Sequence, residues 1–385
     1  MSHIYLDYNA TTPLKPAVYE AMVPYLKDAY GNPSSIHWAG REAKEGVMIA
    51  REQVAKLFHV DPQEVVFVSG GTEANNLALK GVYFKLQNKG RHIITTKVEH
   101  KSVLECLEYL KTHGADVTYL SVNSQGDIDF EELKKAIRPD TILVSVQAAN
   151  NETGVLMPMK EMSALIKERQ ILFHTDAVQI AGKMPFYLNE IPADLVSVSS
   201  HKIYGPKGAG ALIIRGGMKL DALIHGGNQE RKRRGGTENV PAIVGFGASC
   251  QIIEEENFLD MKRIEQLRND LEEGIVRKIS GAYVNGLGAT RVPNTLNVSF
   301  DGLDGEGLLL NLDLQGIAAS SGSACSSGLL DPSHVLLAME VSEELAMSSV
   351  RFSLGYQTTE KDIETVIRIL PEIVSDLRKM NAGCQ

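Results

Sequence analysis

The sequence contains few cysteines, and their positions exclude several classes of protein. Among its 385 residues are four cysteines, Cys106, Cys250, Cys325 and Cys384, and no two of them form a C-x-x-C pair. Cysteines scattered in this way predict neither a zinc site nor a disulfide framework. We therefore expect no bound metal and a reducing, cytoplasmic environment, because disulfide-rich proteins belong to oxidising compartments.

Long apolar runs and an excess of basic residues are also missing. No stretch approaches the roughly 18 consecutive apolar residues of a transmembrane helix. The first residues, MSHIYLDYNATTPL, show neither the basic region nor the apolar core of a signal peptide. The formal net charge of -9 has the opposite sign to that of a typical nucleic-acid-binding protein. We therefore expect neither membrane insertion nor direct binding of nucleic acid.

What the sequence does contain is a series of short apolar segments that are typical of a buried sheet. Between residues 64 and 215 these segments, rich in Val, Ile and Leu, alternate with amphipathic segments of helical periodicity. Such a pattern indicates an α/β fold whose mostly parallel sheet is buried on both faces. The predicted strands lie within residues 64–70, 92–98, 116–122, 141–149, 171–179, 193–200 and 208–215.

The remainder of the chain predicts a second unit. Helical periodicity continues to about Lys278, and further apolar segments follow at residues 295–303, 305–320 and 348–355, before a terminal helix at 360–380. A chain of 385 residues is also longer than one ordinary domain. We therefore expect two domains, of which the second is smaller and mixes strands with helices.

Polar residues follow several of the predicted strands, and in parallel sheets ligands bind beyond the carboxyl ends of the strands. Gly70, Gly71 and Thr72 lie between a strand and a helix, where glycines and a helix N-terminus favour an anion such as phosphate. The same residues also suit an ordinary turn with a threonine N-cap. Taken alone, the turn interpretation is slightly favoured.

At three further strand ends the polar residues can have either a structural role or a role in ligand binding. His100 can make a structural hydrogen bond near a helix start, Asn150 and Asn151 are common turn formers, and Asp176 can cap the segment that follows it. Asp176, with Gln179 three residues later, can equally hold a proton on a bound heterocycle.

The segment VSVSSHKIYGPKG, residues 196–208, gives these strand ends a common chemistry. Lys202 lies where an apolar strand stops, whereas Lys207 lies beyond a Gly-Pro turn, where lysines are usually solvated. A lysine partly desolvated in a cleft has a lowered pKa and can form a Schiff base. A phosphate-binding turn, a carboxylate and such a lysine together describe a site for pyridoxal phosphate (PLP). Ser199 and His201 beside Lys202 would contribute to phosphate binding.

At this point the sequence resembles the NifS/IscS-type cysteine desulfurases, which are PLP enzymes of aminotransferase fold type I. The resemblance covers essentially the whole chain in order, and the set of motifs is far more specific than any one of them. The motifs are LDYNATTPL, GNPSSIH, SGGTEANNLAL, ANNETG, HTDAVQ, SSHKIYGPKGAGAL, RRGGTENVPAIVG, SSGSACSSG and SVRFSLG.

The resemblance implies a particular domain organisation. A large PLP-binding domain of residues 14–262 would contain a mostly parallel, seven-stranded sheet sandwiched by helices. A smaller α+β domain of residues 1–13 and 263–385 would carry the catalytic cysteine in a loop of about residues 319–333.

The resemblance also implies a role for each candidate site residue. Lys202 would bind the cofactor covalently, and Lys202, Cys325 and His100 would be the catalytic residues. The cofactor would also contact Gly71, Thr72, His100, Asn151, Asp176, Gln179, Ser199 and His201, with Asp176 at the pyridine nitrogen and Gln179 at the ring oxygen. Asn151 and Arg351 would bind the substrate carboxylate. Thr237 would reach the phosphate of a neighbouring subunit, which implies a homodimer.

Cys325 also stands out from its surroundings in the sequence. It lies in a Ser/Gly-rich loop that has little apolar surface to bury, whereas Cys106 and Cys250 lie in apolar, helical contexts typical of core cysteines. Cys384, at the chain end, is a rival by exposure, although residues there are usually disordered.

The predicted function is conversion of L-cysteine to L-alanine, with the sulfur held as a cysteine persulfide. The SSGSACSSG loop is similar to that of group I desulfurases, which implies sulfur transfer to acceptors such as an iron–sulfur scaffold or a tRNA-thiolation enzyme. The alternatives are a selenocysteine lyase, another PLP-dependent lyase or aminotransferase, and a non-catalytic sulfur-trafficking scaffold. The basic segment of residues 230–236 is interpreted as a solvated loop rather than a docking surface.

Overall fold

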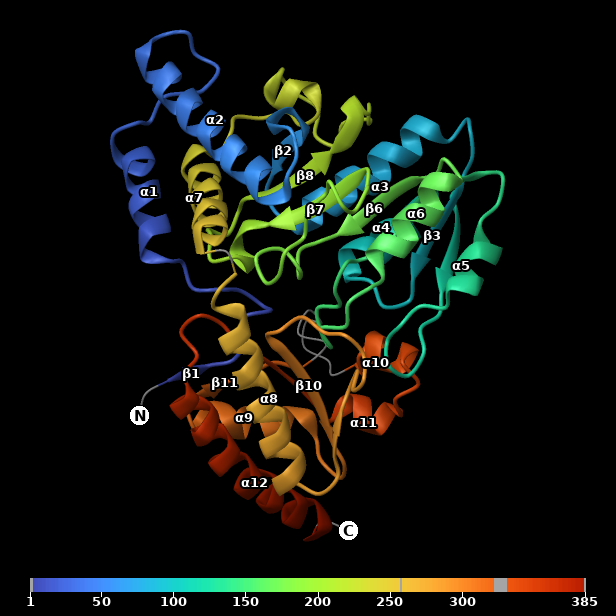
Figure 1. Cartoon of the computed structure of the whole chain (residues 1–385), viewed down its shortest axis with the longest axis vertical. Helices are drawn as coiled ribbons and strands as arrows, with labels where there is room; N and C mark the ends of the chain where they lie inside the picture. Colours follow the sequence, from blue (N-terminus) through green and yellow to red (C-terminus); the bar gives the residue numbers. More distant parts are fainter. Residues whose placement is uncertain (1–2, 257, 322–330, 384–385) are drawn as a thin grey trace.

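A computed structural model describes residues 3–256, 258–321 and 331–383 (Figure 1). Its largest sheet has seven strands in the order β2-β8-β7-β6-β5-β3-β4. These are β2 (Val65–Val68), β3 (His92–Thr96), β4 (Asp116–Leu120), β5 (Thr141–Ser145), β6 (Leu172–Asp176), β7 (Leu195–Ser199) and β8 (Gly210–Ile214). Strand β8 runs antiparallel to β2 and β7, and the other neighbours are parallel. The prediction of a mostly parallel α/β sheet is confirmed.

Both faces of this sheet are buried because successive strand residues point into two different cores. In β2, Val66 and Val68 belong to a core shared with helices α3 and α4, whereas Val65 and Phe67 belong to a core shared with α2, α6 and α7. Burial on both faces favours apolar residues on both sides of a strand, which explains the near-continuous apolar runs of β2 and β8. The helices around the sheet are α1 (Pro16–Lys27), α2 (Trp38–Phe58), α3 (Gly71–Leu86), α4 (Lys101–Lys111), α5 (Phe130–Ala136), α6 (Met159–Glu168) and α7 (Val240–Glu256).

A second group of elements lies below this sheet in Figure 1. It is built on the antiparallel sheet β12-β10-β9 and on a parallel pair formed by β1 and β11. Leu6, Leu271, Phe300, Phe352 and Val366 contribute to one further apolar core there. The elements are β1 (Ile4–Tyr5), α8 (Met261–Lys278), β9 (Ala282–Val284), β10 (Thr295–Phe300), α9 (Gly305–Leu314), β11 (Ile317–Ala318), α10 (His334–Ala338), α11 (Glu343–Met347), β12 (Ser349–Ser353) and α12 (Glu360–Gly383).

The chain start and the chain end thus meet in one core. The domain boundaries at residues 13/14 and 262/263 themselves stay a prediction.

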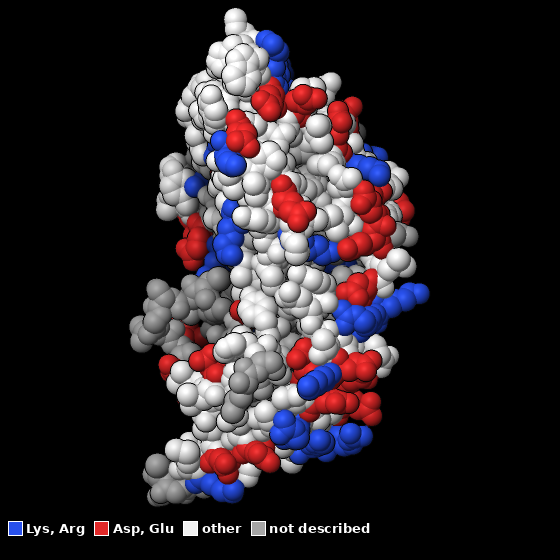
Figure 2. All heavy atoms as spheres, turned by 90° about the vertical axis from the view of Figure 1, so that its left-hand side faces the viewer, with Lys and Arg blue, Asp and Glu red and all other residues white. Residues whose placement is uncertain are grey.

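The surface carries both signs of charge. Figure 2 shows acidic and basic side chains interspersed among the described residues of one face. In the described part of the chain, no helix combines the length and the apolarity needed to cross a membrane.

Two glycines allow β8 to lie against the turn that follows β2. Gly70 has a φ of 156°, which favours glycine. A Cβ atom at Gly210 would lie 2.7 Å from the Gly70 Cα atom and 2.7 Å from the Val198 carbonyl oxygen. The position of the Gly70–Gly71 turn therefore depends on the absence of a side chain on the neighbouring strand.

We expect Gly210→Ala to destabilise the protein by about 1–3 kcal/mol, because the added methyl group meets backbone atoms that have no room to move. Gly307→Ala is the control, for which we expect an increase in the free energy of unfolding. Gly307 lies within α9 with its nearest neighbour at 3.4 Å, so alanine should stabilise by roughly 0.5–1 kcal/mol through helix propensity. Urea unfolding measures both. If Gly210→Ala has the same free energy of unfolding as wild type, β8 and the Gly70–Gly71 turn are not closely packed.

Candidate active site

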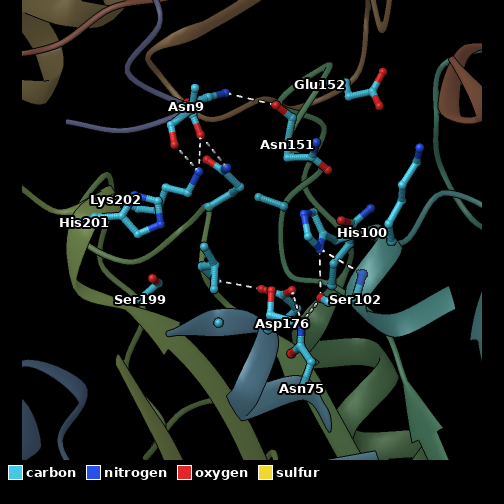
Figure 3. A pocket seen from close by; sticks show the side chains of 18 of the residues that line it. Asn9, Asn75, His100, Ser102, Asn151, Glu152, Asp176, Ser199, His201 and Lys202 are labelled. Atoms are coloured by element: carbon cyan, nitrogen blue, oxygen red, sulfur yellow. Dashed lines mark hydrogen bonds between the residues drawn. The ribbon is translucent and has the colours of Figure 1, made fainter. Parts of the chain in front are cut away.

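A pocket of about 380 Å³ lies where the carboxyl ends of the central strands face the second group of elements (Figure 3). It lies within the range of 300–1,000 Å³ that is common for small-molecule sites. Ten of the predicted site residues line it, namely Gly71, Thr72, His100, Asn151, Asp176, Gln179, Ser199, His201, Lys202 and Arg351. The structure thus brings together residues that are separated by up to 280 positions in the sequence, from 71 to 351.

One wall of the pocket is suited to an anion. Helix α3 begins at Gly71, so its first N–H groups lie at the pocket. A Cβ atom at Gly71 would lie 2.8 Å from Val178 Cγ2, so a side chain there would narrow this wall. Among the described residues, the buried Ser199 hydroxyl has no hydrogen-bond partner, which leaves a donor for a ligand. Burial and the charges of Lys202 and Lys207 lower the pKa of His201 to about 4, so its ring is neutral at pH 7.

Asp176 lies at the end of β6 and is 7% exposed. Its carboxylate accepts hydrogen bonds from Asn75 Nδ2 at 2.7 Å and from the Val178 backbone N–H at 3.0 Å. These neutral donors hold the carboxylate in place but leave its charge to be matched by a ligand. This suits a carboxylate that faces a cationic ring nitrogen.

Hydrogen bonds with Ser102 hold the His100 side chain in place. The Ser102 backbone N–H donates to His100 Nδ1 at 3.1 Å, so Nδ1 is an acceptor and Nε2 carries the proton of the neutral ring. The Ser102 hydroxyl lies 2.8 Å from the same nitrogen and also accepts from Asn75 Nδ2. Asn75 therefore connects His100 and Asp176, and Figure 3 shows the three side chains at one end of the pocket.

Lys202 follows β7 in a short 3-10 turn, Ser200–Lys202. Its Nζ donates to the backbone carbonyls of Asn9 at 2.6 Å and Ala10 at 2.7 Å. The N-terminal segment is itself fixed to this turn, because the Thr12 backbone N–H donates to the His201 carbonyl at 2.9 Å. Lys207, in contrast, is exposed.

Arg351 reaches the pocket from β12 of the smaller sheet and is 3% exposed. It donates to Asp7 Oδ1 at 2.9 Å and to the Asn151 carbonyl at 3.0 Å. Among the described residues, its buried Nε atom has no hydrogen-bond partner. The guanidinium thus keeps donor capacity beside Asn151, which suits a carboxylate ligand.

Thr237 and Cys325 are not placed in this pocket. Thr237 is exposed and is not among the residues that line the pocket, and Cys325 lies outside the described residues.

The segment before Thr237 is only partly the solvated loop that its charge pattern indicated, since Arg231 and Lys232 are exposed but other charged residues are paired. Glu230 is buried and forms a salt bridge with Arg51 at 2.6 Å, and Arg231 donates to the Gln63 carbonyl at 2.7 Å. Arg234 pairs with Glu73 at 2.9 Å. These charges hold the segment against β2 and the start of α3. The number of charges in the segment alone does not reveal such pairs, because the partners are distant in the sequence.

Several residues that shape the pocket escaped the sequence analysis. Asn9 and Asn75 lie inside the motifs LDYNATTPL and SGGTEANNLAL, so their positions carried a signal that was not used. Glu152 also lines the pocket, accepts a hydrogen bond from Ser333, and has its pKa raised to about 7 by burial. Lys183, buried behind Gln179, had no recognisable signal in the sequence.

Comparison with known proteins assigns the fold and site to a class. The sequence model of the family "Aminotransferase class-V" matches residues 4–366. The cysteine desulfurase IscS of Dictyoglomus turgidum is 49% identical over 98% of this chain and 96% of its own. The IscS of Methanosarcina thermophila is 46% identical over 98% of this chain and 93% of its own.

Solved structures agree with this assignment. A NifS-like protein superposes with a TM-score of 0.91 at 40% identity, covering 98% of this chain and all of that one. A structure described as SspA in complex with cysteine gives a TM-score of 0.81 at 36% identity, covering 91% of this chain and 98% of that one. The chain belongs to the class-V aminotransferase family and, within it, to the IscS/NifS cysteine desulfurases. PLP is the cofactor of this family, so the family and cofactor predictions are confirmed.

Glu99 lies fully buried beside the pocket and generates a testable pH dependence. Its Oε1 accepts from Thr96 Oγ1 at 2.7 Å and from the Gln147 N–H at 3.0 Å, and burial raises its pKa to about 8. The folded protein therefore holds a proton that the unfolded chain releases near the ordinary value of 4.5. The contribution of this proton to the free energy of unfolding is fully present below about pH 4.5 and is lost as the pH rises toward 8.

We expect Glu99→Gln to reduce this decline, since the amide keeps an oxygen for both donors and does not titrate. The difference between the wild-type and variant stabilities, measured by urea unfolding, should change by up to roughly 1.4 kcal/mol per pH unit in that window. The exposed Glu161→Gln serves as the control and should follow the wild-type profile. Parallel profiles for wild type and Glu99→Gln would mean that Glu99 is ionised in the folded protein.

Proposed function

We propose that this protein is a PLP-dependent cysteine desulfurase that converts L-cysteine to L-alanine and retains the sulfur on Cys325. The observation that carries the proposal is the meeting of Lys202, Asp176 and the Gly71 turn in one pocket. Full-length similarity to IscS proteins supports the same reaction.

The pocket residues fit PLP. The α3 N-terminus with Gly71, Thr72, Ser199 and neutral His201 would hold the phosphate, and the unpartnered Ser199 hydroxyl supports this placement within the described structure. Asp176 would face the pyridine nitrogen and Gln179 the ring oxygen. The bound cofactor supplies an electron sink for the bonds at the substrate Cα atom, attached through the Lys202 amine.

The side chains around the cofactor have separate tasks in this proposal. Arg351 and Asn151 bind the substrate carboxylate and so orient the amino acid. Lys202 takes the proton from the substrate Cα atom when its amine is released. His100 Nε2 exchanges a proton with the substrate thiol, which the fixed Nδ1 acceptor position supports.

The sulfur transfer requires a nucleophile outside the described residues. The Cys325 thiolate attacks the substrate sulfur, its new S–S bond forms as the carbon–sulfur bond breaks, and the carbon fragment is protonated to alanine. Substrate and enzyme thiol thus become alanine and an enzyme persulfide, with every atom accounted for. The persulfide sulfur then passes to an acceptor, for which we propose an iron–sulfur scaffold or a tRNA-thiolation enzyme in the cytoplasm.

We further propose that the active form is a homodimer in which Thr237 reaches the phosphate of the partner's cofactor. The exposure of Thr237 and its position outside the pocket of its own chain support this arrangement. The ion pairs of Glu230 and Arg234 would hold its segment in place for that contact.

Lys202, and not Lys207, should carry the cofactor. Borohydride reduction of the loaded protein, followed by peptide mapping, should place the label on Lys202 because that amine lies in the pocket and Lys207 is exposed. Lys202→Ala should lose the label and Lys207→Ala should keep it. A label on Lys207 contradicts the assignment.

Cys325 should carry the sulfur. After one turnover with L-cysteine, mass spectrometry should find one added sulfur atom on the peptide of Cys325, the predicted nucleophile. Cys325→Ser should still bind PLP and L-cysteine but form no persulfide, and Cys384→Ser is the matched control that should behave as wild type. Sulfur on Cys384, or normal alanine formation by Cys325→Ser, would rule out the proposed mechanism.

A further inference from the structure

Lys183 is a buried lysine that the proposed mechanism does not use. It is 6% exposed and lies behind Gln179, beside a small cavity that also contacts Lys202. Among the described residues it forms no salt bridge, and the charged groups that act on it, Lys202 and Arg351, are both cations. A lysine buried without an acid is costly. Its position therefore calls for a reason beyond packing.

The contacts of Lys183 are two amide oxygens. Its Nζ donates to Gln179 Oε1 at 2.6 Å and to Asn9 Oδ1 at 2.7 Å. Burial together with the charges of Lys202 and Arg351 holds the pKa of Lys183 well below its ordinary value. A neutral amine has two N–H groups, one for each of these oxygens, so the contacts do not require a charged lysine.

These contacts decide which way the Gln179 carboxamide points. Because the oxygen of Gln179 is engaged by Lys183, its nitrogen lies on the other side, where Nε2 donates to the Asn9 carbonyl at 3.2 Å. The reversed carboxamide would bring two carbonyl oxygens together there and lose the bond to Lys183. Gln179 lines the pocket, so its second N–H is the group available to a ligand.

The backbone between the two residues also serves this arrangement. Gly182 has a φ of 70°, and a Cβ atom there would lie 2.8 Å from Ile203 and Ile253 side-chain atoms. This left-handed residue turns the chain so that Lys183 returns to Gln179, four positions earlier.

We propose that Lys183 is a positioning residue, which fixes the Gln179 carboxamide so that it presents an N–H donor to the ring oxygen of PLP. This inference rests on the proposed function, because it needs the cofactor in this pocket. A donor is required there, since the ring oxygen carries negative charge and would be repelled by an amide oxygen. Lys183 would thus act on the cofactor through Gln179 without contacting it.

A double-mutant cycle on cofactor affinity tests the proposal. The dissociation constant of PLP is measured by fluorescence titration of the apoprotein for wild type, Lys183→Met, Gln179→Leu and the double variant. Each single change should raise the constant by about tenfold, as expected for loss of one hydrogen bond to a charged group. The double variant should match Gln179→Leu within about twofold, because Lys183 acts through Gln179. The visible absorption band of the bound cofactor should shift alike in all three variants.

The controls separate positioning from general structure. Lys135→Met makes the same substitution at an exposed lysine outside the pocket and should leave the affinity unchanged. Urea unfolding of each apoprotein reports stability independently, and Lys183→Leu replaces the methionine variant if that variant does not fold. If the two single effects multiply to about a hundredfold, or if Lys183→Met binds PLP like wild type, the proposal is wrong. If wild type itself does not bind PLP at Lys202, the proposed function fails instead.

Discussion

The pocket depends on one buried asparagine, Asn9, which connects the two sheets. Its side chain donates to Thr295 Oγ1 at 2.8 Å and its backbone N–H donates to Ser353 Oγ at 2.9 Å, both in the smaller sheet. Its carbonyl accepts from Lys202 at 2.6 Å, on the side of the large sheet. Because Asn9 is 1% exposed, these bonds face little competition from water. The segment that contains Asn9 thus determines the separation between Lys202 and Arg351 across the pocket.

The pocket also concentrates positive charge in a place that is poor in water. Lys202 and Arg351 line the pocket, and burial, together with their charges, lowers the pKa of Lys183 behind it. Asp7, which pairs with Arg351, offsets part of this charge. A phosphate and an amino-acid carboxylate bring the compensating negative charges. The charges of Lys202 and Arg351 therefore favour anionic groups on the ligands, whereas Asp176 in the same pocket favours a cationic one.

The sequence predicted the fold well where a pattern is local, and less well where it is not. The strands were found because burial on both faces favours near-continuous apolar runs, as in β2 and β8. Hydrophobicity carries no information on direction, so the antiparallel orientation of β8 was not predicted. Lys183 was missed because its contact with Asn9 joins residues 174 positions apart. The ion pairs of Glu230 and Arg234 were not predicted because their partners, Arg51 and Glu73, lie far away in the sequence.

The described residues on either side of the segment that contains Cys325 are held at the pocket. Before it, the backbone of Ser320 exchanges hydrogen bonds with that of Arg351, at 2.7 Å and 3.2 Å. After it, the Ser333 hydroxyl donates to Glu152, and His334 Nε2 lies 3.0 Å from the Glu99 carbonyl. Arg351, Glu152 and His334 all line the pocket, so Ser320 and Ser333 are both bonded to its lining or lie next to it. Five positions separate Ser320 from Cys325, which limits the distance between their Cα atoms to roughly 17 Å. This limit is compatible with the proposed attack of Cys325 on a substrate held at Arg351.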